Sequence, residues 1–144
     1  DVDYPDAESE REMILRTTGA KTSDPRPVFS EGDLPALQAF IREMPVGESV
    51  VDAILSLVRR TRPGPDAGEM VNTYLDWAPG PRCSQALMLA VRARALLDER
   101  AAPSVDDVKA LAAPVMKHRT ALNFKARSDG VTLESVLESL TEDL

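Results

Sequence analysis

The 144-residue sequence contains few of the residues that build disulfides, metal centres or self-contained active sites. A single cysteine, Cys83, excludes an internal disulfide, and a single histidine, His118, excludes a two-histidine metal site. The glycine-rich phosphate-binding patterns G-x-x-x-x-G-K-S/T and G-x-G-x-x-G are both absent. We therefore expect no metal, no cofactor held by this chain alone, and no catalysis by this chain alone.

Basic residues are outnumbered, with 17 Lys and Arg against 24 Asp and Glu, for a formal net charge of -7. This excess of acid argues against nucleic acid or an anionic membrane as the main partner. No run approaches the roughly 20 apolar residues of a membrane span, and no signal peptide opens the sequence. The sequence starts at Asp1 rather than at Met, so we expect one cytoplasmic domain cut from a larger protein.

Helical periodicity dominates the sequence, and strand-like alternation is nearly absent. These patterns predict an all-α bundle of five to seven helices, joined by loops at 19–30 and 61–73. The expected helices follow Asp6 and cover about 33–44, 48–60, 81–100, 104 onward and 132–140, with a kink or an early end at Pro114. Tyr74 and Leu75 could pair with Leu122 and Phe124 as a short two-stranded ribbon.

Apolar spacing also predicts which helix faces are buried. We expect a buried stripe on the second helix and a wide buried face on the third, and we expect the long helix to bury mainly leucine and alanine. The residues on these three faces are Leu34, Leu37, Phe40 or Ile41 and Met44; Val50, Val51, Ile54, Leu55, Leu57 and Val58; and Ala86, Leu87, Leu89, Ala90, Ala93, Leu96 and Leu97.

Arg82 is unusual because a cation stands at the start of a helix, directly after a Pro-Gly-Pro turn. The helix dipole disfavours a cation there by up to about 1 kcal/mol, unless an anion occupies the site. Arg82 therefore either binds an anion such as phosphate or pairs with a carboxylate such as Asp76 or Asp52. Cys83, in the same turn, is expected to be a packing residue whose pKa the helix start lowers.

The other basic cluster, Arg59, Arg60 and Arg62, falls at the end of the third helix. Phosphate binding is one interpretation of it, and a solvated helix end is the one that ordinary charge placement favours. His118 stands between Lys117 and Arg119, and we expect it to be structural or to face solvent.

Taken in order, several segments resemble the C-terminal lid domain of MoxR-type AAA+ ATPases, and the likeness covers essentially all 144 residues. Residues 1–6 resemble the junction between the ATPase core and the lid, and 50–52 resemble the start of a lid helix. Residues 74–77, followed by 80–82, resemble the G-A-S-P-R segment that carries the family's sensor 2 arginine. Residues 103–119 resemble the segment that comes next. The sequence departs from G-A-S at 78–80, where it has Ala-Pro-Gly.

The resemblance implies that residues 1–144 form a lid domain, with the ATPase core and its Walker motifs outside this chain. Arg82 would reach the γ-phosphate of ATP and sense nucleotide state, and Pro81 would belong to the same cofactor-binding segment. The implied cofactor is ATP with Mg²⁺ in the parent protein. The implied partners are the core domain, neighbouring ring subunits and von Willebrand A-domain proteins, in a chaperone-type motor that remodels or matures partner proteins.

A second hypothesis is a stand-alone, non-enzymatic helical interaction module that uses its acidic surface and the 61–73 loop. A Walker motif encoded upstream would favour the ATPase, whereas a nearby initiator Met would favour the module. An exposed apolar patch is expected in the lid hypothesis, and Tyr74 and Trp77 are the candidates for it.

Overall fold

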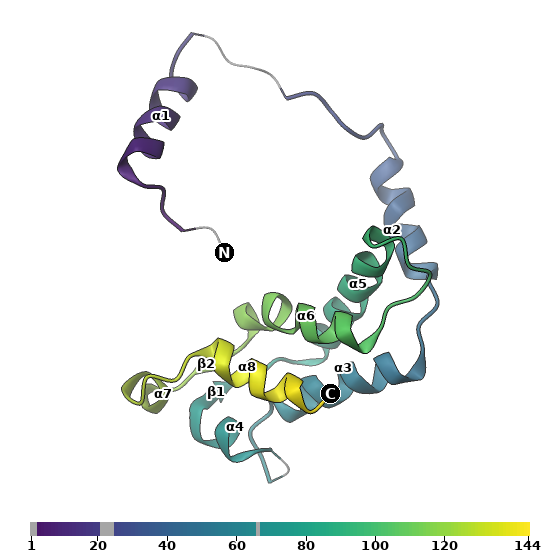
Figure 1. Cartoon of the computed structure of the whole chain (residues 1–144), viewed down its shortest axis with the longest axis vertical. Coiled ribbons are helices and arrows are strands. Elements are labelled where there is room, and N and C mark those ends of the chain that lie inside the picture. Colours follow the sequence, from purple (N-terminus) through teal and green to yellow (C-terminus); the bar gives the residue numbers. More distant parts are fainter. Residues whose placement is uncertain (1–2, 21–24, 66) are drawn as a thin grey trace. The chain divides into compact units, whose positions relative to one another are not determined.

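The computed structural model describes residues 3–20, 25–65 and 67–144 (Figure 1). In these ranges it has eight α-helices, a short 3-10 helix and a two-stranded sheet, which confirms the mostly helical prediction. The chain divides into two units, Asp1–Leu34 and Pro35–Leu144, each of which is described by itself. The elements are α1 (Ala7–Thr17), α2 (Asp33–Glu43), α3 (Glu48–Arg60), α4 (Glu69–Tyr74), β1 (Leu75–Trp77), α5 (Pro81–Leu97), α6 (Val105–Met116), η1 (Lys117–Arg119), β2 (Ala121–Leu122), α7 (Phe124–Ser128) and α8 (Leu133–Glu142).

The first unit contains α1, which begins where the sequence predicts. The Asp6 side chain accepts a hydrogen bond from the Ser9 backbone N–H at 2.8 Å, and this bond lowers the pKa of Asp6. A carboxylate in this position satisfies a free N–H group and complements the helix dipole. No residue of α1 is buried.

The second unit holds the hydrophobic core, in which α3, α5, α6 and α8 pack against one another. Each of these helices places one apolar face in the core, as helical periodicity requires. The most deeply buried large side chains are Ile54, Leu57, Leu87, Met116 and Leu137. Arg92 of α5 donates a hydrogen bond to the carbonyl oxygen of Arg42 at 3.1 Å, which ties the end of α2 to this core.

The predicted buried faces are partly wrong. On α2 only the flanking Met44 is buried, and Leu37 and Phe40 are 38% and 53% exposed. Val51 and Leu55 of α3 are likewise on the surface, and on α5 the buried residues are Cys83, Leu87, Val91 and Ala95. Periodicity identifies the apolar residues of a helix, but burial also requires a neighbouring element to cover them.

The small sheet confirms the predicted ribbon, since β1 and β2 pair antiparallel with Leu75 opposite Leu122 and Trp77 opposite Ala121. Two short helices beside it were not predicted. Helix α4 occupies the end of the 61–73 range that was expected to be a loop and includes Tyr74, which was expected to be in the ribbon. Helix α7 begins at Phe124, which was also expected to extend the ribbon. Asn123 causes the second change, because its side chain caps α7 by accepting from the Ala126 N–H at 3.0 Å.

Helix α6 begins with the predicted capping box between Ser104 and Asp107. It continues through Pro114, which is exposed, and gives way to η1 after Met116. The helix therefore does not end at Pro114, as one form of the prediction had it, but two residues beyond it. None of the helices in the described ranges is both long enough and apolar enough to cross a membrane.

Candidate functional site

The candidate site is the turn that joins β1 to α5. Pairing with β2 holds β1 in place, and the chain then passes through the buried Pro79 to Gly80, the N-cap of α5. Pro81 occupies the first turn of α5, where its missing N–H costs nothing. The Cys83 N–H donates to the Gly80 carbonyl at 2.9 Å, which closes the first turn. The turn is thus anchored on both sides of Arg82.

Pro81 and Arg82 are both exposed at this helix start. Among the described residues, neither Asp76 nor Asp52 forms an ion pair with Arg82, and no side-chain hydrogen bond involves its guanidinium. The alternative that Arg82 pairs with one of these carboxylates therefore finds no support. A cation with no counter-ion among the described residues therefore stands at the positive end of a 17-residue helix.

Cys83 is completely buried, which confirms it as a packing residue. The prediction that the helix start lowers its pKa is wrong: burial raises the pKa of the thiol, and the positive charge of Arg119 only partly offsets this effect. A buried thiol with a raised pKa is a poor nucleophile, because it is seldom in the reactive thiolate form.

Arg119 is a second cation near this turn, and its position in the sequence does not by itself indicate a place in the site. It lies two residues before Ala121, whose partner in the sheet is Trp77, so the antiparallel register brings it alongside the start of the turn. Its guanidinium is half-buried, donates to the Val115 carbonyl at 2.6 Å and contacts the ring of His118. The ion pairs among the described residues do not include Arg119. The pairing of β1 with β2 is thus the feature that places Arg119 near the turn that carries Arg82.

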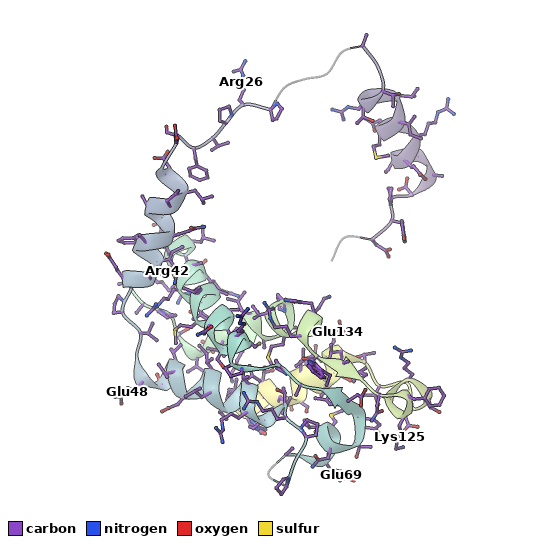
Figure 2. The ribbon with its side chains drawn as sticks, turned by 180° about the vertical axis from the view of Figure 1, so that it is seen from behind. Arg26, Arg42, Glu48, Glu69, Lys125 and Glu134 are labelled. Carbon is purple, nitrogen blue, oxygen red and sulfur yellow. The ribbon has the colours of Figure 1, made fainter. Side chains whose placement is uncertain are left out.

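The two aromatic candidates differ in their surroundings. Trp77 is 69% exposed, as predicted for a patch that another surface covers. Tyr74 is half-buried, and its hydroxyl lies 3.3 Å from a carboxylate oxygen of Asp129. Lys125, labelled in Figure 2, bonds the same carboxylate and lies 5.7 Å from the centre of the Tyr74 ring. Tyr74 is therefore held within the domain, and Trp77 is the exposed aromatic beside the turn.

The exposed residues of α3 contribute to an apolar hollow between α3 and α5. Its volume is about 540 Å³, and Val51 and Leu55 line one side while Met88 and Leu89 line the other. His118 is exposed, as expected. Within the described ranges, no group of three or more His, Cys, Asp or Glu side chains is arranged to hold a metal ion.

Comparison with known proteins agrees with this architecture. Residues 68–140, just over half of the chain, match the family described as the AAA lid domain, and this range includes the β1–α5 turn and Arg82. The chain is 30% identical to the chaperone MoxR1 of Mycobacterium tuberculosis over 142 residues, which is 98% of this chain and 37% of that protein. It is 28% identical to the uncharacterized protein YeaC of Bacillus subtilis over 138 residues, covering 95% of this chain and 41% of that protein.

A solved structure shares the fold. A crystal structure of a candidate ATPase from Cytophaga hutchinsonii superposes with a TM-score of 0.81 at 24% identity, over 99% of this chain and 44% of that one. The chain therefore spans less than half the length of each of these proteins.

Proposed function

Because the chain belongs to the AAA lid domain family, we propose that it acts as the lid of a MoxR-like AAA+ ATPase and closes over ATP bound to a core domain. All 144 residues serve this lid function in the proposal, including the part before residue 68. The core domain, the Walker motifs and the Mg²⁺ site belong to the rest of the parent polypeptide. This chain alone does not hydrolyse ATP.

The observation that carries the proposal is the guanidinium of Arg82 at the start of α5, which has no partner among the residues that the structure describes. The helix start and the guanidinium both attract an anion, and the anchored turn holds them together. Arg119 adds a second positive charge nearby. The residues present therefore fit one wall of a phosphate site, with Pro81 in the backbone that shapes it.

Arg82 supplies the nucleotide-sensing step in this proposal. Its planar fork pairs with two oxygens of a phosphate at once, so the contact is directional as well as electrostatic. Bound ATP supplies a γ-phosphate, which hydrolysis removes. Arg82 then loses its partner, and the lid is free to change its angle to the core.

We propose the partners from the exposed surface of the chain and from its family. The exposed Trp77 and the apolar hollow at Val51 and Leu55 suit contact with the core domain or with a neighbouring subunit of a ring. Through such contacts a movement of the lid would change the position of the neighbouring subunits in a cytoplasmic chaperone-type motor. This motor would remodel or mature partner proteins, with von Willebrand A-domain proteins as candidates.

The experiment is Arg82→Ala in the full-length polypeptide. We expect ATP turnover to fall by about tenfold or more, because a charge-assisted bidentate contact is lost. Arg127→Ala is the matched control, since Arg127 is exposed on α7 and lacks an ion pair among the described residues. Circular dichroism should show an unchanged helical fold for both variants.

Unchanged turnover in Arg82→Ala would overturn the role of Arg82. An upstream coding sequence without a Walker motif would overturn the ATPase itself. The second outcome would favour the stand-alone helical interaction module, whose binding surface would then include the hollow between α3 and α5.

A further inference from the structure

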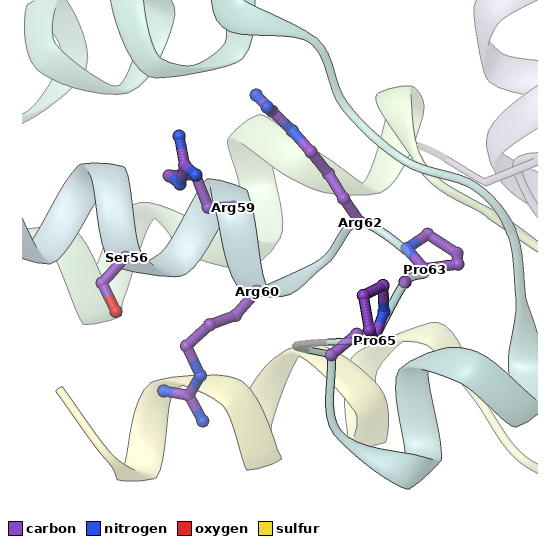
Figure 3. A pocket seen from close by; sticks show the side chains of 8 residues that line it. Ser56, Arg59, Arg60, Arg62, Pro63 and Pro65 are labelled. Carbon is purple, nitrogen blue, oxygen red and sulfur yellow. The ribbon is translucent and has the colours of Figure 1, made fainter.

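The three arginines at the end of α3 surround a hollow that the proposed lid function does not use (Figure 3). The hollow has a volume of about 500 Å³ and lies between the last turn of α3 and the Pro63–Pro65 turn. This volume is within the range of pockets that take small ligands. No carboxylate is among the described residues that line it, although the chain as a whole carries a net charge of -7.

Arg60 is one wall of this hollow, and its charge is already compensated. Its guanidinium lies 2.5 Å from a carboxylate oxygen of Asp143 and donates to the Leu140 carbonyl at 3.3 Å. Figure 3 shows Arg60 directed toward α8, away from the other two arginines. Arg60 therefore fastens α3 to α8 and leaves Arg59 and Arg62 as the available cations.

Arg59 and Arg62 lie close together, and no described residue supplies a counter-ion to either of them. The Arg62 N–H donates to the Arg59 carbonyl at 3.1 Å, so a single turn of backbone separates the two residues. Figure 3 shows both side chains extending to the same side of α3. The ion pairs and side-chain hydrogen bonds of the described residues include neither guanidinium. Two like charges in this arrangement repel each other until an anion lies between them.

Hydrogen bonds fix the backbone between the two arginines and the backbone of the turn that follows them. Thr61, between them, is completely buried, and its hydroxyl donates to the Val58 carbonyl at 2.8 Å. Asn72 accepts from the Gly64 N–H at 2.8 Å and donates to the carbonyls of Gly64 and Ala67 at 3.0 and 3.1 Å. A site whose backbone is already ordered loses less entropy when it binds a ligand.

We infer that Arg59 and Arg62 form a binding site for a small free oligophosphate, of which inorganic pyrophosphate is the simplest. Two guanidinium forks directed at one ligand need acceptor oxygens on more than one side of it. A carboxylate has its two oxygens in one plane, so it presents a matching pair of oxygens to one fork and not to a second. A phosphate group offers oxygens in a tetrahedral arrangement, and pyrophosphate offers two such groups, so each arginine can bind its own pair.

A solvated helix end is the competing explanation of the same residues. The carboxyl end of α3 carries about half a negative charge, which one arginine is enough to complement. Arg60 already lies at this end and also pairs with Asp143. Because Asp143 compensates Arg60, the helix dipole accounts for Arg59 in the last turn and leaves Arg62, which lies beyond the helix, unexplained.

The test is a titration of the 144-residue chain with inorganic pyrophosphate, followed by NMR of the arginine side-chain N–H groups in low salt. We expect saturable binding with shifts at Arg59 and Arg62. Arg59→Ala and Arg62→Ala should each weaken binding by about tenfold. Arg127→Ala removes the same charge from α7 and should change the affinity by less than about twofold, because screening weakens distant charges.

Two further experiments distinguish a specific binding site from a surface that attracts anions only by its positive charge. Arg59→Lys and Arg62→Lys keep the charge but lose the fork, so we expect weaker binding, and equal binding would overturn the bidentate site. Citrate tests the ligand class, and an affinity for it equal to that for pyrophosphate would overturn the choice of phosphate. Shifts that never saturate, or an equal loss in Arg127→Ala, would overturn the site as a whole. Thermal unfolding verifies that every variant is folded.

Discussion

Asp107 is the carboxylate that the described part of the fold buries, with 2% of its surface exposed. Arg100 contacts both of its oxygens, at 2.6 and 2.8 Å, and the Ser104 N–H donates to it at 2.8 Å. Hydrogen bonding from Arg100, together with the bond from Ser104, outweighs the effect of burial and lowers the pKa of Asp107 from 3.8 to about 2. The start of α6 and the segment after α5 are joined through this one carboxylate.

Replacing this carboxylate should therefore destabilise the fold. We expect Asp107→Asn to lower the free energy of unfolding at pH 7 by about 2–3 kcal/mol, because Arg94 and Arg100 both lose this ionised partner and Arg100 keeps only the exposed Asp98. Urea unfolding followed by circular dichroism measures the change. Asp106→Asn is the matched control, since Asp106 is an exposed neighbour on α6, and it should change the free energy by less than about 0.5 kcal/mol. Equal effects at 106 and 107 would contradict the account.

The difference in unfolding free energy between the wild type and Asp107→Asn should depend on pH. Because the pKa of Asp107 is lower in the folded state, its stabilising effect is complete above the unfolded pKa of 3.8 and is lost as the pH falls through about 2. The difference in unfolding free energy between the wild type and Asp107→Asn should thus narrow by about 1 kcal/mol between pH 7 and pH 3. A constant or widening difference would show that the carboxylate is not held in its ionised form.

At the scale of one element, α5 ends earlier than the sequence predicts, and a single backbone conformation is the reason. The helix was expected to reach Arg100, but it stops at Leu97 because Glu99 has a φ of 57°. The Arg100 N–H then bonds the Ala95 carbonyl at 2.8 Å, and the Glu99 N–H bonds the Leu96 carbonyl at 3.0 Å. This pattern is the Schellman motif, in which glycine is the preferred residue at the left-handed position.

Glu99→Gly should therefore stabilise the chain. We expect the free energy of unfolding to rise by about 0.5–1 kcal/mol, since glycine adopts a positive φ without the steric cost that glutamate bears. Glu138→Gly is the control, because Glu138 is exposed inside α8, where glycine should cost about 1 kcal/mol. Both changes are measured by urea unfolding. A loss of stability in Glu99→Gly would mean that the side chain makes contacts that outweigh the strain.

Some helix boundaries could be predicted from the sequence, whereas contacts between distant elements could not. The starts of α1, α6 and α8 were predictable because Asp6, Ser104 and Thr132 cap them through local bonds. The ribbon was predicted, but its register was not, because pairing depends on contacts between distant segments. For the same reason the sequence singled out Arg82 at its helix start and missed its neighbour Arg119.

At the scale of the whole molecule, the buried core belongs to the second unit. Every buried apolar residue of the described ranges lies between Met44 and Leu140, and α1 and α2 contribute none. The apolar side chains of α2 and the hollow between α3 and α5 remain on the surface instead. Since folding stability comes mainly from buried apolar area, the two units should contribute to it very unequally.

This inequality predicts the effect of a truncation. A shortened chain that begins at residue 29 keeps α2 intact, together with the hydrogen bond from the Ser30 N–H to Asp33 at 2.7 Å. We expect its Tm to lie within about 2 °C of that of the full chain, because no buried residue of the described ranges is removed. Leu137→Ala, which truncates a side chain that is 1% exposed, is the positive control and should cost about 2–5 kcal/mol. Calorimetry measures both changes. If the truncation lowered the Tm as much as Leu137→Ala does, the first unit would be an integral part of the folded core, and the division of the chain into two units would be wrong.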